Sequence, residues 1–180
     1  MILNLPNFLS VSRIISVPLL VILLIDQLFG WALLIFIVAA VTDAVDGLLA
    51  RLLHQRTVLG SYLDPVADKL LTASSFTILA LLNILPGWLA VIVISRDVII
   101  LLGLMILFLT SRFPEIRPSL ASKVTTVFQL CTVITALFFK SAFSVPFLLE
   151  FLIWSTALGT IISGLQYVEK GIRIFNQVIP

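Results

Sequence analysis

Residues 43–68 read DAVDGLLARLLHQRTVLGSYLDPVAD, and this stretch holds four of the chain's six aspartates. Long apolar sequence lies on both sides of it, in residues 31–42 and 70–85. An ionisable side chain within membrane-spanning sequence is costly and is a functional-site hypothesis by default. The stretch therefore indicates both a membrane bundle and the place of its site.

The composition of the 180-residue chain is typical of a polytopic membrane protein. Hydrophobic residues make up 61% and charged residues 11%, against about 25% charged in soluble domains. A spanning helix needs about 20 mostly apolar residues. Six segments predict an all-α bundle of six transmembrane helices in one domain, residues 1–180: Phe8–Leu28, Trp31–Leu53, Ser61–Leu85, Gly87–Leu109, Ser122–Phe139 and Val145–Tyr167.

Basic residues orient this bundle, because Lys and Arg concentrate in cytoplasmic loops. With the N-terminus in the cytoplasm, only Lys140 falls outside. The cytoplasmic set is Arg13, Arg51, Arg56, Arg112, Arg117, Lys123, Lys170 and Arg173. We therefore expect a multi-pass protein of the cell inner membrane with both termini in the cytoplasm.

Glycine and proline positions agree with these boundaries. Pro6 precedes the first span, Gly30 separates the first two, and Pro86 with Gly87 separates the third from the fourth. The single cysteine, Cys131, lies in an apolar run, where we expect a small core side chain.

The four aspartates fall at similar depths. At about 1.5 Å per residue, Asp43 and Asp46 lie about 18 and 22 Å from Trp31. Asp64 and Asp68 lie about 5 to 11 Å inward from the start of the third span, which runs the other way. Residues three or four apart share a helix face, so both pairs can face one cavity between adjacent helices on the cytoplasmic side.

Carboxylates gathered in this way would repel one another, and divalent cations neutralise them better than any other group in the chain. Ligation by oxygen alone favours Mg²⁺ or Mn²⁺ over zinc. Two ions about 3.5 to 4 Å apart form a clamp suited to phosphoryl transfer. We therefore expect two Mg²⁺ or Mn²⁺ ions at the four aspartates.

Some of these residues are also compatible with purely structural roles. Asp64, just before Pro65, could cap a helix start, and Gly47 and Ala50 could allow close helix packing. Capping does not account for the first aspartate pair, which lies too deep. A small cation transporter or channel would also use buried carboxylates, although no inverted repeat is visible.

The pattern is DxxDGxxAR, eight residues, then GxxxDxxxD, and at all eight positions it resembles the signature of the CDP-alcohol phosphotransferases. The resemblance implies a membrane enzyme of phospholipid biosynthesis that transfers a phosphatidyl group from CDP-diacylglycerol to a hydroxyl acceptor and releases CMP. It implies that Asp43, Asp46, Asp64 and Asp68 bind the metals, with Asp68 also the general base. The implied CDP-diacylglycerol-binding residues are Asp43, Asp46, Gly47, Ala50, Arg51, Gly60 and Asp64. It further implies a homodimer; we expect membrane lipids, and no nucleic acid, as partners.

Four basic residues outside the signature bear on the acceptor: Arg13, Arg96, Arg117 and Lys123. Because Arg and Lys bind phosphate oxygens, we expect an acceptor that carries a phosphate. Arg96, near the middle of a span, is the costliest of them, and it could instead pair with an aspartate of the signature or with Asp97. The chain resembles both the phosphatidylglycerophosphate synthase and the CMP-forming cardiolipin synthase branches. We expect glycerol 3-phosphate as acceptor; phosphatidylglycerol is the alternative, because the first branch usually has Glu where this chain has Asp97.

Overall fold

The structure, a computed structural model, describes the backbone of residues 5–52, 58–109, 120–141 and 146–176, and the side chains of 12–42, 68–103, 120–141 and 146–169. The described chain forms six helices and no strand, which confirms the all-α prediction. The helices are α1 (Leu5–Ile25), α2 (Phe29–Leu52), α3 (Val58–Leu81), α4 (Gly87–Leu109), α5 (Leu120–Ser141) and α6 (Pro146–Asn176).

Several of the predicted helix boundaries were wrong. Pro6 does not precede the first helix and Gly30 does not separate the first two, because they lie in the first turns of α1 and α2. The chain turns instead at Gln27 and Asn83, whose φ angles are 58° and 54°. A left-handed residue commonly follows a helix end, and α3 accordingly ends at Leu81.

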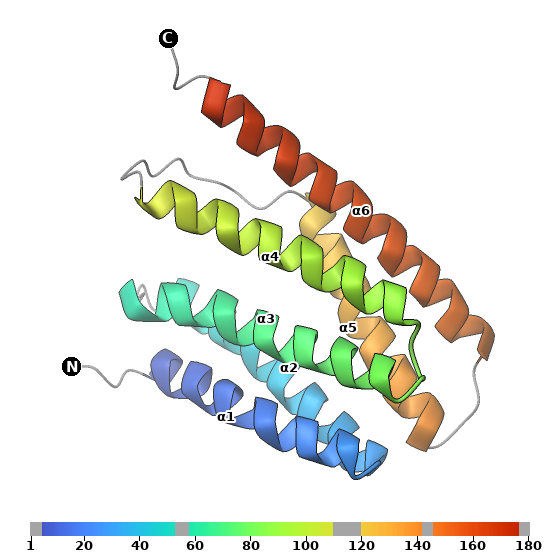
Figure 1. Ribbon diagram of the computed structural model, residues 1–180. Helices are drawn as coiled ribbons and strands as arrows, with labels where there is room; N and C mark the ends of the chain where they lie inside the picture. The colour runs from blue at the N-terminus through green and yellow to red at the C-terminus, as the bar shows by residue number, and fades with distance from the viewer. Residues whose placement is uncertain (1–4, 53–57, 110–119, 142–145, 177–180) are drawn as a thin grey trace.

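The helices form a closed ring of neighbours in the order α1, α3, α4, α6, α5, α2, and α5 also contacts α3 across the ring (Figure 1). α1 begins and α6 ends on the same side of the bundle (Figure 1). Among the described residues, the principal contacts of α2 are with α1 and α5, and those of α3 are with α1 and α4. The two helices that carry the aspartates thus flank α1 and both meet α5, and among the described contacts they are not the adjacent pair that was predicted.

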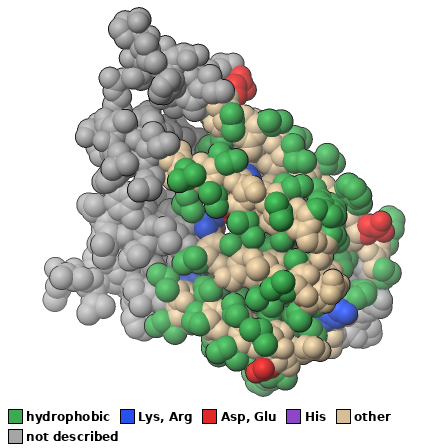
Figure 2. Space-filling model, in the orientation of Figure 1, with side chains coloured by type: hydrophobic (Ala, Val, Ile, Leu, Met, Phe, Trp, Pro, Cys, Tyr) green, Lys and Arg blue, Asp and Glu red, His purple; other side chains and the backbone are tan. Residues whose placement is uncertain are grey.

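The bundle has apolar side chains on its outside and many polar ones within. Figure 2 shows hydrophobic side chains spread over the described face, and exposed large hydrophobic residues occur on all six helices. Among the described residues, the buried polar side chains are Arg13, Thr72, Ser75, Arg96, Asp97, Ser122, Thr125, Gln129, Thr132, Thr156, Thr160 and Ser163. Water-soluble monomers rarely expose an apolar surface of this extent, whereas a bundle in contact with lipid tails does.

Among the described side chains, an apolar core lies toward the end of the bundle where α2, α4 and α6 begin (Figure 1). Phe36, Phe76, Leu89 and Leu137 are among its fully buried members. Several of the buried polar side chains, including Arg13, Arg96 and Asp97, lie near the middle of their helices. Cys131 does not belong to the core as predicted: it is exposed on α5.

The α5–α6 contact relies on small and polar residues, as transmembrane helix pairs often do. The hydroxyls of Thr132 on α5 and Thr156 on α6 lie 2.8 Å apart and share a hydrogen bond. Nearby, Gly159 of α6 lies against Thr125 of α5: a Cβ at Gly159 would be 3.0 Å from the Thr125 Oγ1. The absence of a side chain at Gly159 therefore allows the two helices to approach closely.

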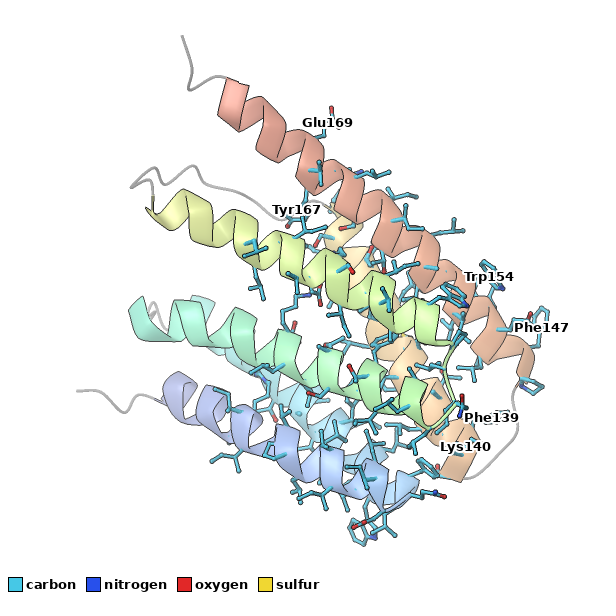
Figure 3. All side chains as sticks on the ribbon, in the orientation of Figure 1. Phe139, Lys140, Phe147, Trp154, Tyr167 and Glu169 are labelled. Carbon is cyan, nitrogen blue, oxygen red and sulfur yellow. The ribbon has the colours of Figure 1, made fainter. Side chains whose placement is uncertain are left out.

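Within the described side chains, two helical segments are long and apolar enough to cross a membrane, Leu120–Ser141 and Pro146–Glu169. The segments Ser12–Ile25 and Phe29–Thr42 are apolar but shorter. The rings of Trp88 and Trp154 pack together with centroids 5.4 Å apart. Figure 3 shows Trp154 and Phe147 toward the same end of the bundle as Lys140. Tryptophan gathers at membrane–water interfaces, so these aromatic side chains suit the edge of a bilayer.

Candidate functional site

The eight signature residues lie on two helices. α2 carries Asp43, Asp46, Gly47, Ala50 and Arg51. α3 carries Gly60, Asp64 and Asp68. Of their side chains only that of Asp68 is described; the other seven lie outside the described residues.

The backbone of α3 excludes one alternative role for Asp64, that of a helix cap. α3 begins at Val58, so Asp64 lies inside the helix and not at its start. An N-cap residue precedes the first helical residue, and capping therefore does not explain Asp64. Asp64 and Asp68 are four residues apart on one continuous helix, as Asp43 and Asp46 are three apart on another, so each pair shares a helix face as predicted.

Asp68 lies in the middle of α3 and its side chain is half-buried. Its carbonyl oxygen accepts a hydrogen bond from the Thr72 hydroxyl at 3.0 Å. Because α3 begins earlier than predicted, Asp68 lies about 15 Å along the helix, at about 1.5 Å per residue. The residue predicted to be the base thus lies on regular helix, with its side chain partly accessible.

Next to Asp68, the described structure contains a polar network that crosses the bundle. Lys69 Nζ donates to Asp97 Oδ1 at 2.9 Å, and Arg96 Nη1 donates to the same oxygen at 2.6 Å. Arg96 Nη2 donates to the Ser122 hydroxyl at 2.6 Å and to the Ser163 hydroxyl at 3.0 Å. The network joins α3, α4, α5 and α6. Two cations share one carboxylate, which leaves one net positive charge.

This network confirms that Arg96 pairs with Asp97, the alternative weighed from the sequence. Arg96 is 3% exposed, and its side-chain stem packs against Gly164 of α6. A guanidinium has five N–H donors, and the bonds to Asp97 and the two serines use three of them. Its Nε and the Oδ2 of Asp97 are buried and have no hydrogen-bond partner among the described residues. Buried polar groups are rarely left unsatisfied, so a donor and an acceptor are available here for water or substrate.

The structure places the predicted acceptor residues on different helices. Arg96 of α4 bonds to buried Ser122 of α5, and Lys123, the next residue on α5, is exposed. Arg13 is 2% exposed on α1, a helix that contacts α2 and α3 and is not among the principal neighbours of α4. Arg117 lies outside the described residues.

Lys69 and the two serines were not singled out from the sequence. Lys69 could have been found, because it is a second ionisable residue next to Asp68 within a predicted span. Ser122 and Ser163 carry no such signal. Small hydroxyl residues are common in membrane helices, and their role depends on which helices are neighbours.

The types of side chain in and around the signature indicate which metal ion the site could bind. Among the described side chains, no three His, Cys, Asp or Glu residues gather closely enough to hold an ion. The signature itself supplies four carboxylates and no thiol or imidazole. This set fits a hard divalent cation.

Comparison with known proteins gives a family match over most of the chain. The model of the CDP-alcohol phosphatidyltransferase family matches residues 3–162. This range contains the whole signature and the Lys69–Asp97–Arg96 network.

Individual relatives cover nearly the full chain. A CDP-diacylglycerol--glycerol-3-phosphate 3-phosphatidyltransferase of Bacillus subtilis is 31% identical, across 93% of this chain and 94% of the relative. A human cardiolipin synthase (CMP-forming) is 34% identical, across 93% of this chain and 62% of the relative. A probable phosphatidylglycerophosphate synthase of Mycobacterium tuberculosis is 32% identical, across 94% of this chain and 82% of the relative.

Proposed function

Because this chain belongs to the CDP-alcohol phosphatidyltransferase family, we propose that it transfers the phosphatidyl group of CDP-diacylglycerol to glycerol 3-phosphate, with release of CMP. The observation that carries this proposal is the complete eight-position signature within the family match. The Bacillus relative, which matches over 93% of this chain and 94% of its own length and is named for this acceptor, supports it. A cation transporter would not need the Gly, Ala and Arg positions of the signature.

The proposed setting is the cell inner membrane, with residues 1–180 as one domain of six spans. The apolar outer surface and the tryptophans at one end support this setting. The basic residues favour a cytoplasmic site and cytoplasmic termini. The site would then receive a nucleotide from water and lipid tails from the bilayer. The family resemblance also supports a homodimer.

Divalent ions are part of the proposal. Asp43, Asp46, Asp64 and Asp68 would hold Mg²⁺ or Mn²⁺, and two ions would form a clamp suited to phosphoryl transfer. Bound there, the ions would supply positive charge to the diphosphate of CDP-diacylglycerol. Arg51 would add a further cation for the diphosphate, since guanidinium groups bind phosphate oxygens.

The small signature residues have a separate proposed role. Gly47, Ala50 and Gly60 would leave room for the cytidine and diphosphate to lie close to the helix backbones. Together with Arg51 and the aspartates, they form the proposed CDP-diacylglycerol pocket.

Asp68 would carry out the proton transfer. It takes the proton from the acceptor hydroxyl, and the hydroxyl oxygen forms a bond to the phosphorus that carries the diacylglycerol. The bond from that phosphorus to the oxygen of the CMP phosphate breaks, and CMP leaves with the bonding electrons. A position on regular helix suits this role, since a general base must lie within hydrogen-bond reach of the proton it removes.

The acceptor phosphate is assigned to Arg96, Lys123, Arg117 and Arg13. The positive charge of the network and the unpartnered Nε of Arg96 support Arg96 in this role. Arg96 lies next to the start of α5, where exposed Lys123 can meet an anion from water.

Phosphatidylglycerol is the second candidate acceptor, which would make the chain a CMP-forming cardiolipin synthase. Asp97 favours this second candidate, because the phosphatidylglycerophosphate synthase branch usually has Glu at that position. The human relative, which is named a cardiolipin synthase (CMP-forming), also supports it. Both acceptors present a phosphate and a free hydroxyl. They differ in whether the acceptor comes from water or from the membrane.

One assay separates these possibilities. Purified protein in lipid is given CDP-diacylglycerol and Mg²⁺ or Mn²⁺, with glycerol 3-phosphate, phosphatidylglycerol or serine, and CMP and lipid products are followed. We expect CMP and phosphatidylglycerophosphate with glycerol 3-phosphate. Cardiolipin from phosphatidylglycerol would support the second candidate, whereas no CMP with any acceptor would contradict the enzyme assignment.

A further inference from the structure

Lys69 follows Asp68 directly on α3, and it bonds to Asp97 at the middle of α4. The side chains of Lys69 and Asp97 are 17% and 5% exposed, so this ion pair lies largely away from the surface. We propose that Lys69 and Asp97 are positioning residues, which fix the direction of the Asp68 carboxylate relative to the acceptor. This inference rests on the proposed function, in which Asp68 is the base.

The contacts of Asp97 connect the base to the acceptor side of the site. Through Arg96, Asp97 is linked to Ser122, and Lys123 is the next residue on α5. One end of the network therefore adjoins Asp68, and the other adjoins a proposed acceptor residue. A shift of α3 against α4 would change the distance between Asp68 and this acceptor residue.

The geometry of a helix makes this separation sensitive to rotation. A side-chain tip lies about 6 Å from the helix axis, so a rotation of about 20° moves it by about 2 Å. A misplacement of about 1 Å can cost a reaction about 100-fold in rate. Lys69, one residue from Asp68, is well placed to prevent such a rotation, because its ammonium is fixed to the neighbouring helix.

Stability alone does not explain the pair. Replacing a buried ion pair by apolar side chains is often neutral or stabilising. The pair also does not maximise hydrogen bonding: both cations bind Oδ1, and Oδ2 has no partner among the described residues. What the arrangement does provide is a fixed relation between three charged side chains on two helices.

The test measures kinetics and binding separately, on the full chain in lipid. The variants are Lys69→Met, Lys69→Arg and Asp97→Asn, and the matched control is Lys140→Met at the exposed end of α5. CMP release is measured with each substrate varied in turn. CDP-diacylglycerol binding without acceptor and the thermal midpoint of each variant are measured in parallel.

We expect Lys69→Met to lower kcat by about 10- to 100-fold, with little change in the KM of the acceptor or in CDP-diacylglycerol binding. Asp97→Asn should lower kcat and also raise the acceptor KM, because it releases Arg96 as well. Lys69→Arg should restore most of the kcat, and Lys140→Met should behave as the wild type.

A wild-type kcat in folded Lys69→Met overturns the positioning role while the proposed function stands. A loss of activity in proportion to the loss of folded protein overturns it too, as a purely structural pair would behave in that way. If Asp97→Asn does not fold, the kinetics of Lys69→Met and Lys69→Arg alone test the positioning role. A wild-type protein that releases no CMP with any acceptor contradicts both proposals.

Discussion

Arg96 donates a hydrogen bond of 2.6 Å to Asp97, its neighbour in the chain, and both side chains are buried in the bundle. Burial of a lone guanidinium in this setting would be costly, and the adjacent carboxylate offsets that cost. Arg96 thus has a structural partner and still retains unused donors.

The substitution Arg96→Ala tests its part in acceptor binding. We expect the acceptor KM to rise by about 10-fold or more, since a hydrogen bond to a charged group contributes about 1.5–3 kcal/mol. CDP-diacylglycerol binding should persist. Steady-state CMP release, with each substrate varied separately, measures both effects.

Two results would count against that role for Arg96. One is an unchanged acceptor KM in a folded Arg96→Ala protein. The other is an equal loss of affinity for both substrates, which would indicate a general disturbance of the bundle. Arg96→Lys is the control for charge, because it keeps the cation but loses the planar fork of donors.

Asp68→Asn should lower turnover by about 10²- to 10⁴-fold, the usual contribution of a general base. The amide keeps the shape of the side chain but cannot take up a proton. Assembly should be spared, which size-exclusion chromatography in detergent can check. Turnover at the wild-type rate would rule out Asp68 as the base.

Removal of divalent ions should stop CMP release, because the four aspartates would then repel one another and the diphosphate. Chelation followed by addition of Mg²⁺ or Mn²⁺ tests this, and activity should return with either ion. Asp43→Asn should raise the metal concentration needed for half-maximal activity. Undiminished activity in chelator would contradict the metal assignment.

The number and order of the helices could be read from the sequence, because each apolar run is long and short polar or proline-containing segments separate the runs. Their ends were less predictable. The turns at Gln27 and Asn83 are left-handed without a glycine, and Gly30, which does resemble a turn residue, lies within α2. The residue at which a helix ends depends here on packing between neighbouring helices more than on local propensity.

In the candidate site, too, some features could be predicted from the sequence and others could not. The aspartate pairs are local features of single helices, so spacing alone placed each pair on one face. The bond between Lys69 and Asp97 joins residues 28 apart in the chain, and it exists because α3 and α4 are neighbours in the ring. Spacing within one helix carries no information about such a contact.

Gly159 provides a test of the α5–α6 contact that is independent of catalysis. A Cβ there would lie 3.0 Å from the Thr125 Oγ1 and 3.7 Å from its Cβ, so Gly159→Ala forces Thr125 or the helices to move. We expect a loss of about 1–3 kcal/mol of stability, as for other overpacked contacts, seen as a lower thermal midpoint in lipid or detergent.

Gly103 on α4 is the matched control, since a Cβ there meets no atom of the described structure within 4 Å. Gly103→Ala should leave the midpoint unchanged or raise it slightly, because Ala is the better helix former. Adding Thr125→Ala to Gly159→Ala removes the hydroxyl that the new methyl group meets, and it should recover part of the loss. Equal midpoints for Gly159→Ala and Gly103→Ala would mean that α5 and α6 do not approach as closely as this contact requires.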